Sequence, residues 1–171
     1  PYPFKELSGC GVGFKMLQGY CLYKGLPFSE VERLLDLVVV SIASDIVPLV
    51  GENRILAFYG LKRLNEKPGK GLQSIIKICG LDKHAITIDD IVFKIGPRIN
   101  AAGRMEVDSD DENAAPSGGH SAVYLMVARD EEVASEYGAF IDTCNQDRKN
   151  IDRSITQEAH DIIERHPEMK A

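Results

Sequence analysis

The last third of the sequence carries one long, uninterrupted helical pattern. Asp130, followed by two glutamates, is a favourable N-cap, and no proline occurs until Pro167. Apolar side chains recur at helical spacing, at Val133, Tyr137, Phe140, Ile141, Cys144, Ile151, Ile155, Ala159, Ile162 and Ile163. A helix over residues 130–165 would be about 54 Å long at ~1.5 Å per residue, which is longer than a compact domain of this size needs. We therefore expect this helix to extend beyond the core of the protein.

The stretch 95–104, IGPRINAAGR, combines a Gly–Pro pair with two arginines and one asparagine. Because the residue before a proline is disfavoured in the α region, Gly96 and Pro97 are expected to end the preceding helix and open a new turn. In a helical turn Asn100 and Arg104 leave from one face. Arginine suits phosphate oxygens, which it binds through paired hydrogen bonds. The pattern indicates a phosphate-binding turn, and the alternative is a loop whose arginines pair with carboxylates.

The acidic second part of the chain contains one basic cluster, and it lies on the long predicted helix. The cluster consists of Asn145, Arg148, Lys149 and Arg153. A cluster of this kind usually forms a solvated helix face. Its place in the chain also allows it to face the same anion as Arg104, and the sequence leaves both interpretations open.

The net charge of −6 is unevenly distributed. Residues 1–105 carry a formal net charge of +4, and residues 106–171 carry −10. This asymmetry argues against a protein that coats nucleic acid generally, but it permits one local basic surface. The four cysteines lack any C-x-x-C spacing, so neither a zinc site nor a disulfide framework is indicated, and a reducing cytosol fits. The longest apolar run, residues 37–43, is too short to cross a bilayer.

Most of the first hundred residues are predicted to form short helices joined by Gly and Pro turns. The run 9–13, GCGVG, lacks the spacing of a dinucleotide-binding fingerprint and indicates a tightly packed helix start. Residues 51–64 and 72–79 have helical spacing. Residues 30–43 are ambiguous, because the N-cap Ser29 and the length favour a helix whereas the β-branched cluster favours a strand; we expect a helix. The predicted fold class is therefore mainly α.

Asp45 follows the apolar run, within the sequence SDIVP. A carboxylate at the end of such a run is costly to bury unless it is hydrogen-bonded, caps a helix or binds a cation. Asp45 is therefore interpreted either as the N-cap of the following element or as a metal ligand.

Residues 106–119, EVDSDDENAAPSGG, are acidic and poor in apolar side chains. This composition predicts a mobile surface loop. The acidic residues lack the central glycine and the closing glutamate of a calcium-binding loop, so calcium is not indicated.

Three segments together resemble the DHH phosphoesterase family and, within it, the single-strand-specific 5′→3′ DNA exonucleases. They are residues 2–15 (YPFKELSGCGVGFK), 43–54 (ASDIVPLVGENR) and 95–105 (IGPRINAAGRM), and their order and spacing match the family. The resemblance implies an enzyme of recombination and repair that removes nucleotides with two Mn²⁺ or Mg²⁺ ions. It further implies a cytoplasmic location, single-stranded DNA as substrate, and a single-strand-binding protein or a helicase as partner of the intact protein.

The resemblance assigns roles only at the matching positions. Asp45 matches an aspartate that completes the metal site. Asn100 and Arg104 match a segment at the active-site cleft, where Arg104 would act as a catalytic residue by binding the scissile phosphate. Asn145 and Arg148 match the start of a helix that links two catalytic lobes. The residues expected to contact nucleic acid are Arg98, Asn100, Arg104, Asn145 and Arg148.

The family's D-x-D and D-H-H motifs, which supply the other metal ligands and the catalytic histidine, are expected to lie before Pro1. We therefore expect this chain to be an inactive fragment of a larger enzyme. On this interpretation residues 1–105 are the C-terminal part of the DHH catalytic domain, which is an α/β domain in the family. Residues 106–119 are an acidic loop insertion, and residues 120–171 are a helical segment that includes the linking helix between the lobes.

Two alternatives remain open. One is a phosphoesterase of the same family that acts on short oligonucleotides or cyclic dinucleotides. The other is a non-enzymatic helical interaction module, which the long helix and the acidic loop would support. For a fragment, we also expect the absent lobes to leave an apolar face exposed, either on residues 37–42 or on the inner stripe of the last helix.

Overall fold

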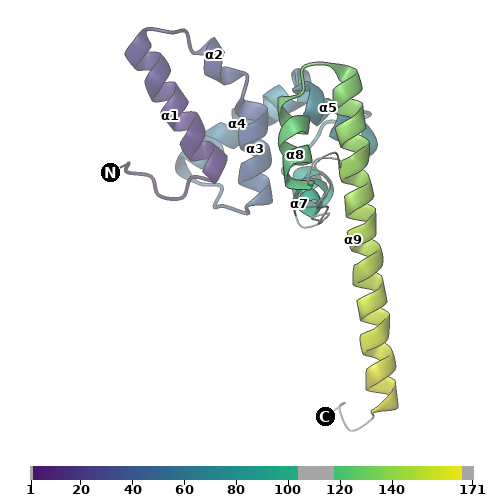
Figure 1. Cartoon of the computed structure of the whole chain (residues 1–171). Helices are drawn as coiled ribbons and strands as arrows, with labels where there is room; N and C mark the ends of the chain where they lie inside the picture. Colours follow the sequence, from purple (N-terminus) through teal and green to yellow (C-terminus); the bar gives the residue numbers. More distant parts are fainter. Residues whose placement is uncertain (1, 104–117, 167–171) are drawn as a thin grey trace.

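The computed structural model describes residues 2–103 and 118–166. Within these residues the chain forms helices joined by short turns, with no β-strand (Figure 1). The helices are α1 (Gly9–Lys24), α2 (Ser29–Glu32), α3 (Leu35–Ser44), α4 (Gly51–Glu66), α5 (Lys70–Ile78), α6 (Ile88–Asp90), the π-helix η1 (Ile91–Ile95), α7 (Gly96–Ala102), α8 (Gly118–Val127) and α9 (Glu131–Arg165). The mainly helical fold class predicted from the sequence is confirmed.

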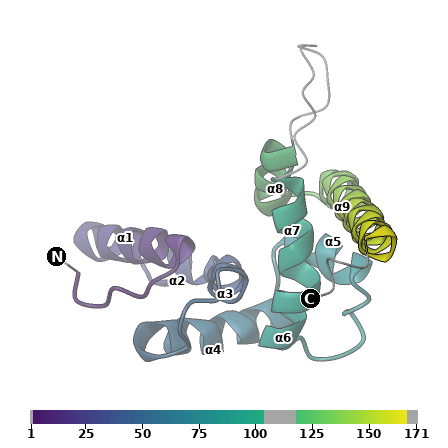
Figure 2. The same ribbon diagram turned by 90° about the horizontal axis from the view of Figure 1, so that it is seen from below.

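Helix α3 lies at the centre of the N-terminal half, between α1 and α4 (Figure 2). Its β-branched side chains are enclosed, and Val39 and Ile42 are almost completely buried. The run that was ambiguous between helix and strand is therefore a buried helix. The expectation of an exposed apolar face on residues 37–42 is wrong, because α1, α4, η1 and α7 pack around this segment. Gly60 of α4 permits the close approach, since a Cβ there would lie 2.5 Å from the carbonyl oxygen of Leu35.

The first half of α9 packs against α5, α7 and α8. Gly138 of α9 lies against Ser74 of α5, and Gly71 of α5 lies against the backbone of Leu125 in α8, so neither glycine has room for a side chain. These contacts produce a second cluster of packed helices beside α3 and α4. The predicted N-cap is confirmed, because the Asp130 side chain accepts a hydrogen bond from the backbone N–H of Val133.

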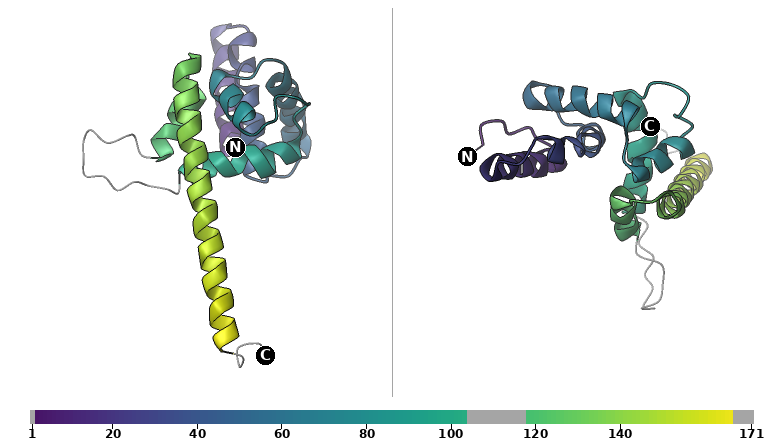
Figure 3. Two further views of the ribbon diagram at one scale, coloured as in Figure 1. Left: turned by 90° about the vertical axis from the view of Figure 1, so that its right-hand side faces the viewer. Right: turned by 90° about the horizontal axis from the view of Figure 1, so that it is seen from above.

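The second half of α9 extends away from all the other helices (Figures 1 and 3). Every residue from 151 to 160 is exposed. The predicted extension beyond the core is therefore confirmed. Apolar side chains still follow one side of this free part, at Ile151, Ile155, Ile162 and Ile163. None of the helices in the described part of the chain is long and apolar enough to span a membrane.

Helices α6, η1 and α7 follow one another without a break from residue 88 to residue 102. The run begins at a capping box, in which Thr87 and Asp90 satisfy each other's backbone N–H groups. The prediction that Gly96 and Pro97 would end a helix is wrong. Gly96 adopts helical angles, with φ −54° and ψ −48°, and its N–H bonds the carbonyl of Ile91 five residues earlier. A glycine before proline has no Cβ to clash with the ring, and the wider π turn receives the proline.

The extended N-terminal residues are fixed to the start of α4. The Tyr2 hydroxyl donates to the Glu52 carboxylate at 2.6 Å, and Lys15 of α1 pairs with the same carboxylate at 3.2 Å. Asn53 is fully buried and its side-chain amide donates to the carbonyl oxygens of Glu6 at 2.6 Å and Pro48 at 3.0 Å. The segment before α1 therefore belongs to the packed structure.

Candidate phosphate-binding site

Helix α7 carries the predicted phosphate-binding turn and packs against the middle of α9. The best-defined contact between them is an ion pair in which Arg98 Nε lies 2.7 Å from Asp142 Oδ1. The guanidinium also donates from Nη1 to the carbonyl oxygen of Lys94 at 2.8 Å. The alternative interpretation, that an arginine of this stretch pairs with a carboxylate, therefore describes Arg98.

Beside this contact a cavity of about 240 Å³ opens between the two helices. It is lined by Pro97, Asn100 and Ala101 of α7 and by Arg148 of α9. Two of the residues predicted to contact nucleic acid, Asn100 and Arg148, therefore lie at one cavity although 48 positions separate them in the sequence. Arg148 uses Nη1 to bind Asp152 one turn further along α9 at 2.8 Å, and no described residue uses its remaining N–H groups.

Asn145 is the buried polar residue of this region. Its side chain is completely enclosed, and neither Oδ1 nor Nδ2 has a hydrogen-bond partner among residues 2–103 and 118–166. It stands three residues from Asp142 and three from Arg148, so all three leave α9 on the side that meets α7. A buried amide without partners costs about 1–3 kcal/mol for each group left unsatisfied. Buried polar atoms in folded proteins almost always have a partner, so the Asn145 amide keeps hydrogen-bonding capacity that no described residue uses.

Acidic and basic side chains both lie near the Cys79 thiol at the end of α5. Burial is the largest influence on this thiol and raises its pKa, the charge of Asp142 acts in the same direction, and the positive charges of Arg98, Lys94 and Lys149 act in the opposite one. Arg98 and Lys94 are themselves paired with Asp142 and Asp90. Arg153, the fourth member of the predicted basic cluster, is exposed and does not line the cavity.

Asp45 occupies the C-cap of α3. Its carboxylate accepts a hydrogen bond from the Ser41 hydroxyl at 2.9 Å and is otherwise exposed. The next residue, Ile46, has a φ of +53°, which turns the chain sharply away from the helix axis. The N-cap interpretation is wrong, because the N-cap of α4 is Val50. The carboxylate is therefore open to a ligand from outside.

The end of α3 lies directly against the start of α7. A Cβ on Gly96 would lie 2.7 Å from the Ser44 hydroxyl oxygen, and that oxygen is buried without a hydrogen-bond partner in the described part of the chain. Asp45 follows Ser44 in the chain, so it stands next to the junction from which α7 leads to Asn100. This contact was not predicted, and the only signal for it in the sequence was a glycine at the start of the central stretch.

The described part of the chain contains no complete metal site. Within residues 2–103 and 118–166, no three His, Cys, Asp or Glu side chains are close enough to hold a metal ion together. The exposed Asp45 carboxylate fits the role of one oxygen ligand within a larger set. Arg104, the predicted catalytic residue, and residues 106–117 of the acidic stretch lie outside the described residues. Residues 118 and 119, which were predicted to end the loop, are the first residues of α8.

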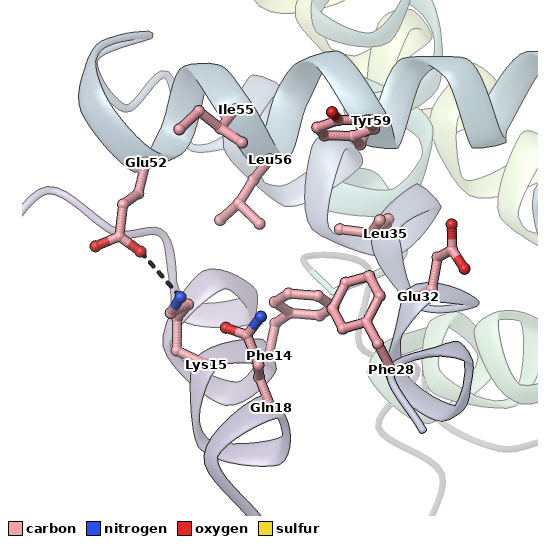
Figure 4. Close-up of a pocket in the computed structure, with 10 residues that line it drawn as sticks. All are labelled: Phe14, Lys15, Gln18, Phe28, Glu32, Leu35, Glu52, Ile55, Leu56 and Tyr59. Atoms are coloured by element: carbon pink, nitrogen blue, oxygen red, sulfur yellow. Dashed lines mark ion pairs between the residues drawn. The ribbon is translucent and has the colours of Figure 1, made fainter. Parts of the chain in front are cut away.

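A separate cavity of about 290 Å³ lies between α1, the α2 region and α4 (Figure 4). Phe14 and Phe28 point into it from one side and meet edge to face, and Leu56 and Tyr59 face them from α4 (Figure 4). The ion pair of Lys15 and Glu52 closes one end. No residue of the predicted site lines this cavity. It is therefore separate from the α7–α9 site.

The chain was compared with protein families and with individual known proteins. No protein-family model matches the sequence. The chain is, however, similar over nearly its whole length to part of several single-stranded-DNA-specific exonucleases. These relatives are RecJ proteins: the Bacillus subtilis protein is 37% identical over 163 residues, or 95% of this chain, and the Escherichia coli protein is 29% identical over 174 residues, or 96% of it.

Solved structures of RecJ share the fold. The Mn²⁺ complex of Thermus thermophilus RecJ superposes with a TM-score of 0.78 at 25% identity over 92% of this chain. A second exonuclease RecJ bound to manganese gives 0.77 at 26% identity over 91%. The resemblance inferred from the three sequence segments is confirmed, and the chain corresponds to a segment of RecJ. It spans 19% and 28% of the two curated relatives above, and 22% and 37% of the two solved chains.

Proposed function

We propose that this chain is the phosphate-facing helical part of a single-stranded-DNA-specific 5′→3′ exonuclease. The observation that carries the proposal is the cavity between α7 and α9 to which Asn100 and Arg148 both contribute. The buried amide of Asn145, which has no partner among the described residues, lies three residues before Arg148 on α9. Arginine and asparagine side chains can donate several hydrogen bonds to phosphate oxygens, and positive charge there supplies sequence-independent affinity for the nucleic-acid backbone. The RecJ proteins that the chain resembles are named as single-stranded-DNA-specific exonucleases.

The site residues take different parts in this proposal. Arg148 supplies positive charge to a bridging phosphate, and Asn100 donates a hydrogen bond from the opposite helix. Asn145 donates from Nδ2 to a phosphate oxygen or to a water that the phosphate holds. Arg104 follows the described part of α7, and its role at the scissile phosphate is carried by the family resemblance alone.

The proposal includes a metal site to which this chain contributes one ligand. The related RecJ structures contain Mn²⁺ or Mg²⁺, and a pair of such ions, when bound, would activate a water and stabilise the leaving oxygen of a phosphodiester. Asp45 fits as one carboxylate ligand, and it follows Ser44, whose hydroxyl oxygen lies against Gly96 at the start of α7. Within the described residues, no group of three possible ligands surrounds Asp45. Because the family resemblance assigns this chain only one metal ligand, we expect the chain alone to be inactive as a nuclease.

In the cell this activity would belong to DNA recombination and repair in the cytoplasm. A single-strand-binding protein or a helicase would supply the single-stranded substrate to the intact enzyme. A related phosphoesterase acting on short oligonucleotides or cyclic dinucleotides would use the same phosphate contacts. Binding that grows with strand length separates the exonuclease from that alternative, because a short-substrate enzyme gains nothing from additional nucleotides.

The exposed stripe on the free half of α9 favours one further candidate, a helical interaction module. Ile151, Ile155 and Ile162 are each exposed along one side of a helix that no other described element covers. Such a module requires no anion at the α7–α9 cavity. It therefore predicts that Asn100 and Arg148 can be replaced without any effect on binding of DNA.

The test measures binding of the chain to a fluorescent, single-stranded oligothymidine by anisotropy at several salt concentrations. Arg148→Ala is expected to weaken binding and to reduce the salt slope by about 0.7, the value for one phosphate contact on a single strand. Arg153→Ala is the matched control, because it removes the same charge from another face of α9 and should leave affinity within twofold. Equal losses for both arginines, or no binding at low salt, would overturn the proposal.

A second arm tests the metal-dependent part. With Mn²⁺ present, the chain is expected to leave a 5′-labelled strand intact. Nuclease activity of the purified chain that survives Asp45→Ala would contradict both the inactivity of the segment and the assignment of Asp45.

A further inference from the structure

Arg98 is placed differently from Arg148, the other arginine of the predicted nucleic-acid contacts that the structure describes. Only 14% of its side-chain surface is exposed, compared with 34% for Arg148. Two sides of its guanidinium are already occupied, by the Asp142 carboxylate at 2.7 Å and by the Lys94 carbonyl at 2.8 Å. Its charge is therefore neutralised by a contact within the protein, and little of it faces solvent.

The two partners of Arg98 belong to different elements. Asp142 lies on α9, and Lys94 lies in η1, just before α7 begins. The Lys94 carbonyl oxygen also accepts a hydrogen bond from the Cys79 thiol at 3.6 Å, which joins the end of α5 to η1. A planar guanidinium can satisfy two partners in fixed directions, which a lysine ammonium does less well. Arg98 is thus the side chain that fixes the start of α7 against α9.

This contact lies one residue from Pro97 and two from Asn100, both of which line the phosphate-facing cavity. On α9, Asp142 precedes Asn145 by three residues and Arg148 by six, so the ion pair stands at one end of the face that carries these groups. A shift of α7 at this point would change the separation of Asn100 from Arg148.

We infer that Arg98 is a positioning residue, whose ion pair with Asp142 sets α7 on α9 so that Asn100 and Arg148 face the same phosphate. Arg98 does not contact the phosphate itself. The expected effect of Arg98 on DNA binding rests on the proposed function. The expected effect of Arg98 on the placement of α7 does not depend on that function.

The decisive variant is Asp142→Asn. Removing an acidic charge beside a nucleic-acid site strengthens binding if Arg98 contacts phosphate, because the guanidinium is then freed. The positioning role predicts the opposite, a loss of about tenfold in affinity for single-stranded oligothymidine, since one charge-assisted hydrogen bond carries roughly one tenfold step. Glu131→Gln is the matched control: it removes the acid from the exposed ion pair between Lys77 of α5 and Glu131 of α9 and should leave affinity unchanged.

A second variant covers the case in which Asp142→Asn does not fold. Arg98→Lys keeps the positive charge and loses the paired geometry. Positioning predicts weakened binding and a salt slope that falls by about 0.7, because Arg148 no longer meets the phosphate, whereas a direct phosphate contact of Arg98 predicts near-normal binding and an unchanged slope. The effect of Arg148→Ala should also shrink to below about twofold in the Arg98→Lys background, because Arg148 is no longer aligned with Asn100. A full and additive loss in the double variant would overturn the inference.

Hydrogen exchange separates this inference from the proposed function. The backbone amides of α7 are expected to exchange faster in Arg98→Lys than in the parent chain, whereas those of α4 should not change. If the parent chain binds no oligonucleotide but α7 still loosens, the proposed function fails and the positioning role stands. Unchanged exchange in α7 would overturn the positioning role.

Discussion

Gly96 and Ser44 are in direct contact, because a Cβ on Gly96 would lie 2.7 Å from the buried Ser44 hydroxyl oxygen. The contact joins the end of α3, where Asp45 is exposed, to the start of α7, which leads to Asn100 and the cavity. The candidate metal ligand and the candidate phosphate contacts are therefore held in one arrangement by a glycine. This arrangement depends on the π turn before Gly96, which allows the helix to continue through Pro97.

Gly96→Ala is expected to destabilise the chain by ~1–3 kcal/mol, because an added methyl group at this junction overpacks a close contact. Denaturant unfolding followed by circular dichroism measures the change. Gly19→Ala is the control, since Gly19 is helical and has no neighbour within 4 Å of an added Cβ. That change should stabilise the chain by up to about 1 kcal/mol. Equal effects at both glycines would contradict the contact.

Asn145→Leu is expected to separate stability from binding. The leucine fills a similar volume and removes two buried polar atoms that have no partner, so the free energy of unfolding without DNA should rise by ~1–3 kcal/mol. The same variant should lose affinity for the oligonucleotide, because the amide that meets the phosphate is gone. Thermal unfolding with and without DNA measures both effects. A strongly destabilised variant would show that the amide has a partner within the free protein.

Burial divides α9 into two parts with different tolerance to substitution. Ile141→Ala should cost ~2–5 kcal/mol, since Ile141 is completely buried among the packed helices. Ile155→Ala, the same change in the free half of the helix, should alter stability by no more than about 0.5 kcal/mol. Unfolding of the two variants under identical conditions gives the comparison. A large effect of Ile155→Ala in dilute solution would mean that this stripe is covered.

Acid should weaken the capping box that begins the α6–η1–α7 run. The Lys94 ammonium, followed by the Thr87 backbone N–H, lowers the pKa of Asp90 from 3.8 to about 2. A lowered folded-state pKa means that the charged form stabilises the native protein above pH ~4, and that this stability is lost as the pH falls toward 2. Asp90→Asn should reduce this acid-dependent loss. Asp89→Asn, at the neighbouring position, should retain it, and stability can be compared between pH 5 and pH 2 by urea unfolding.

The regular parts of the fold could be predicted from the sequence. The cap at Asp130 and the unbroken spacing that follows it specify α9 to within a residue, because helix caps and periodicity are local signals. The helical state of α3 was less certain, since a fully buried run shows no amphipathic period. Its burial could not be predicted, because it depends on α1, α4 and α7 coming from other parts of the chain.

The site was predicted only in part, for similar reasons. The spacing of arginine and asparagine in residues 95–104 indicated a phosphate-facing turn. Asn100 of this turn and Arg148 of α9 do line one cavity. The local sequence could not show that Arg98 is held by Asp142, because its partner lies 44 residues away. It also gave the wrong result at Pro97, where the π turn absorbs a proline that ordinarily stops a helix.

The most direct test of the account observes the Asn145 side chain itself. In a nitrogen-15 NMR titration with a single-stranded oligothymidine, the Asn145 side-chain NH₂ signals, assigned by their loss in Asn145→Leu, are expected to shift together with the Asn100 and Arg148 signals. This result would place the phosphate backbone at the α7–α9 cavity. Saturating DNA binding with the Asn145 and Arg148 signals unmoved, or shifts confined to α1 and α4, would contradict the account.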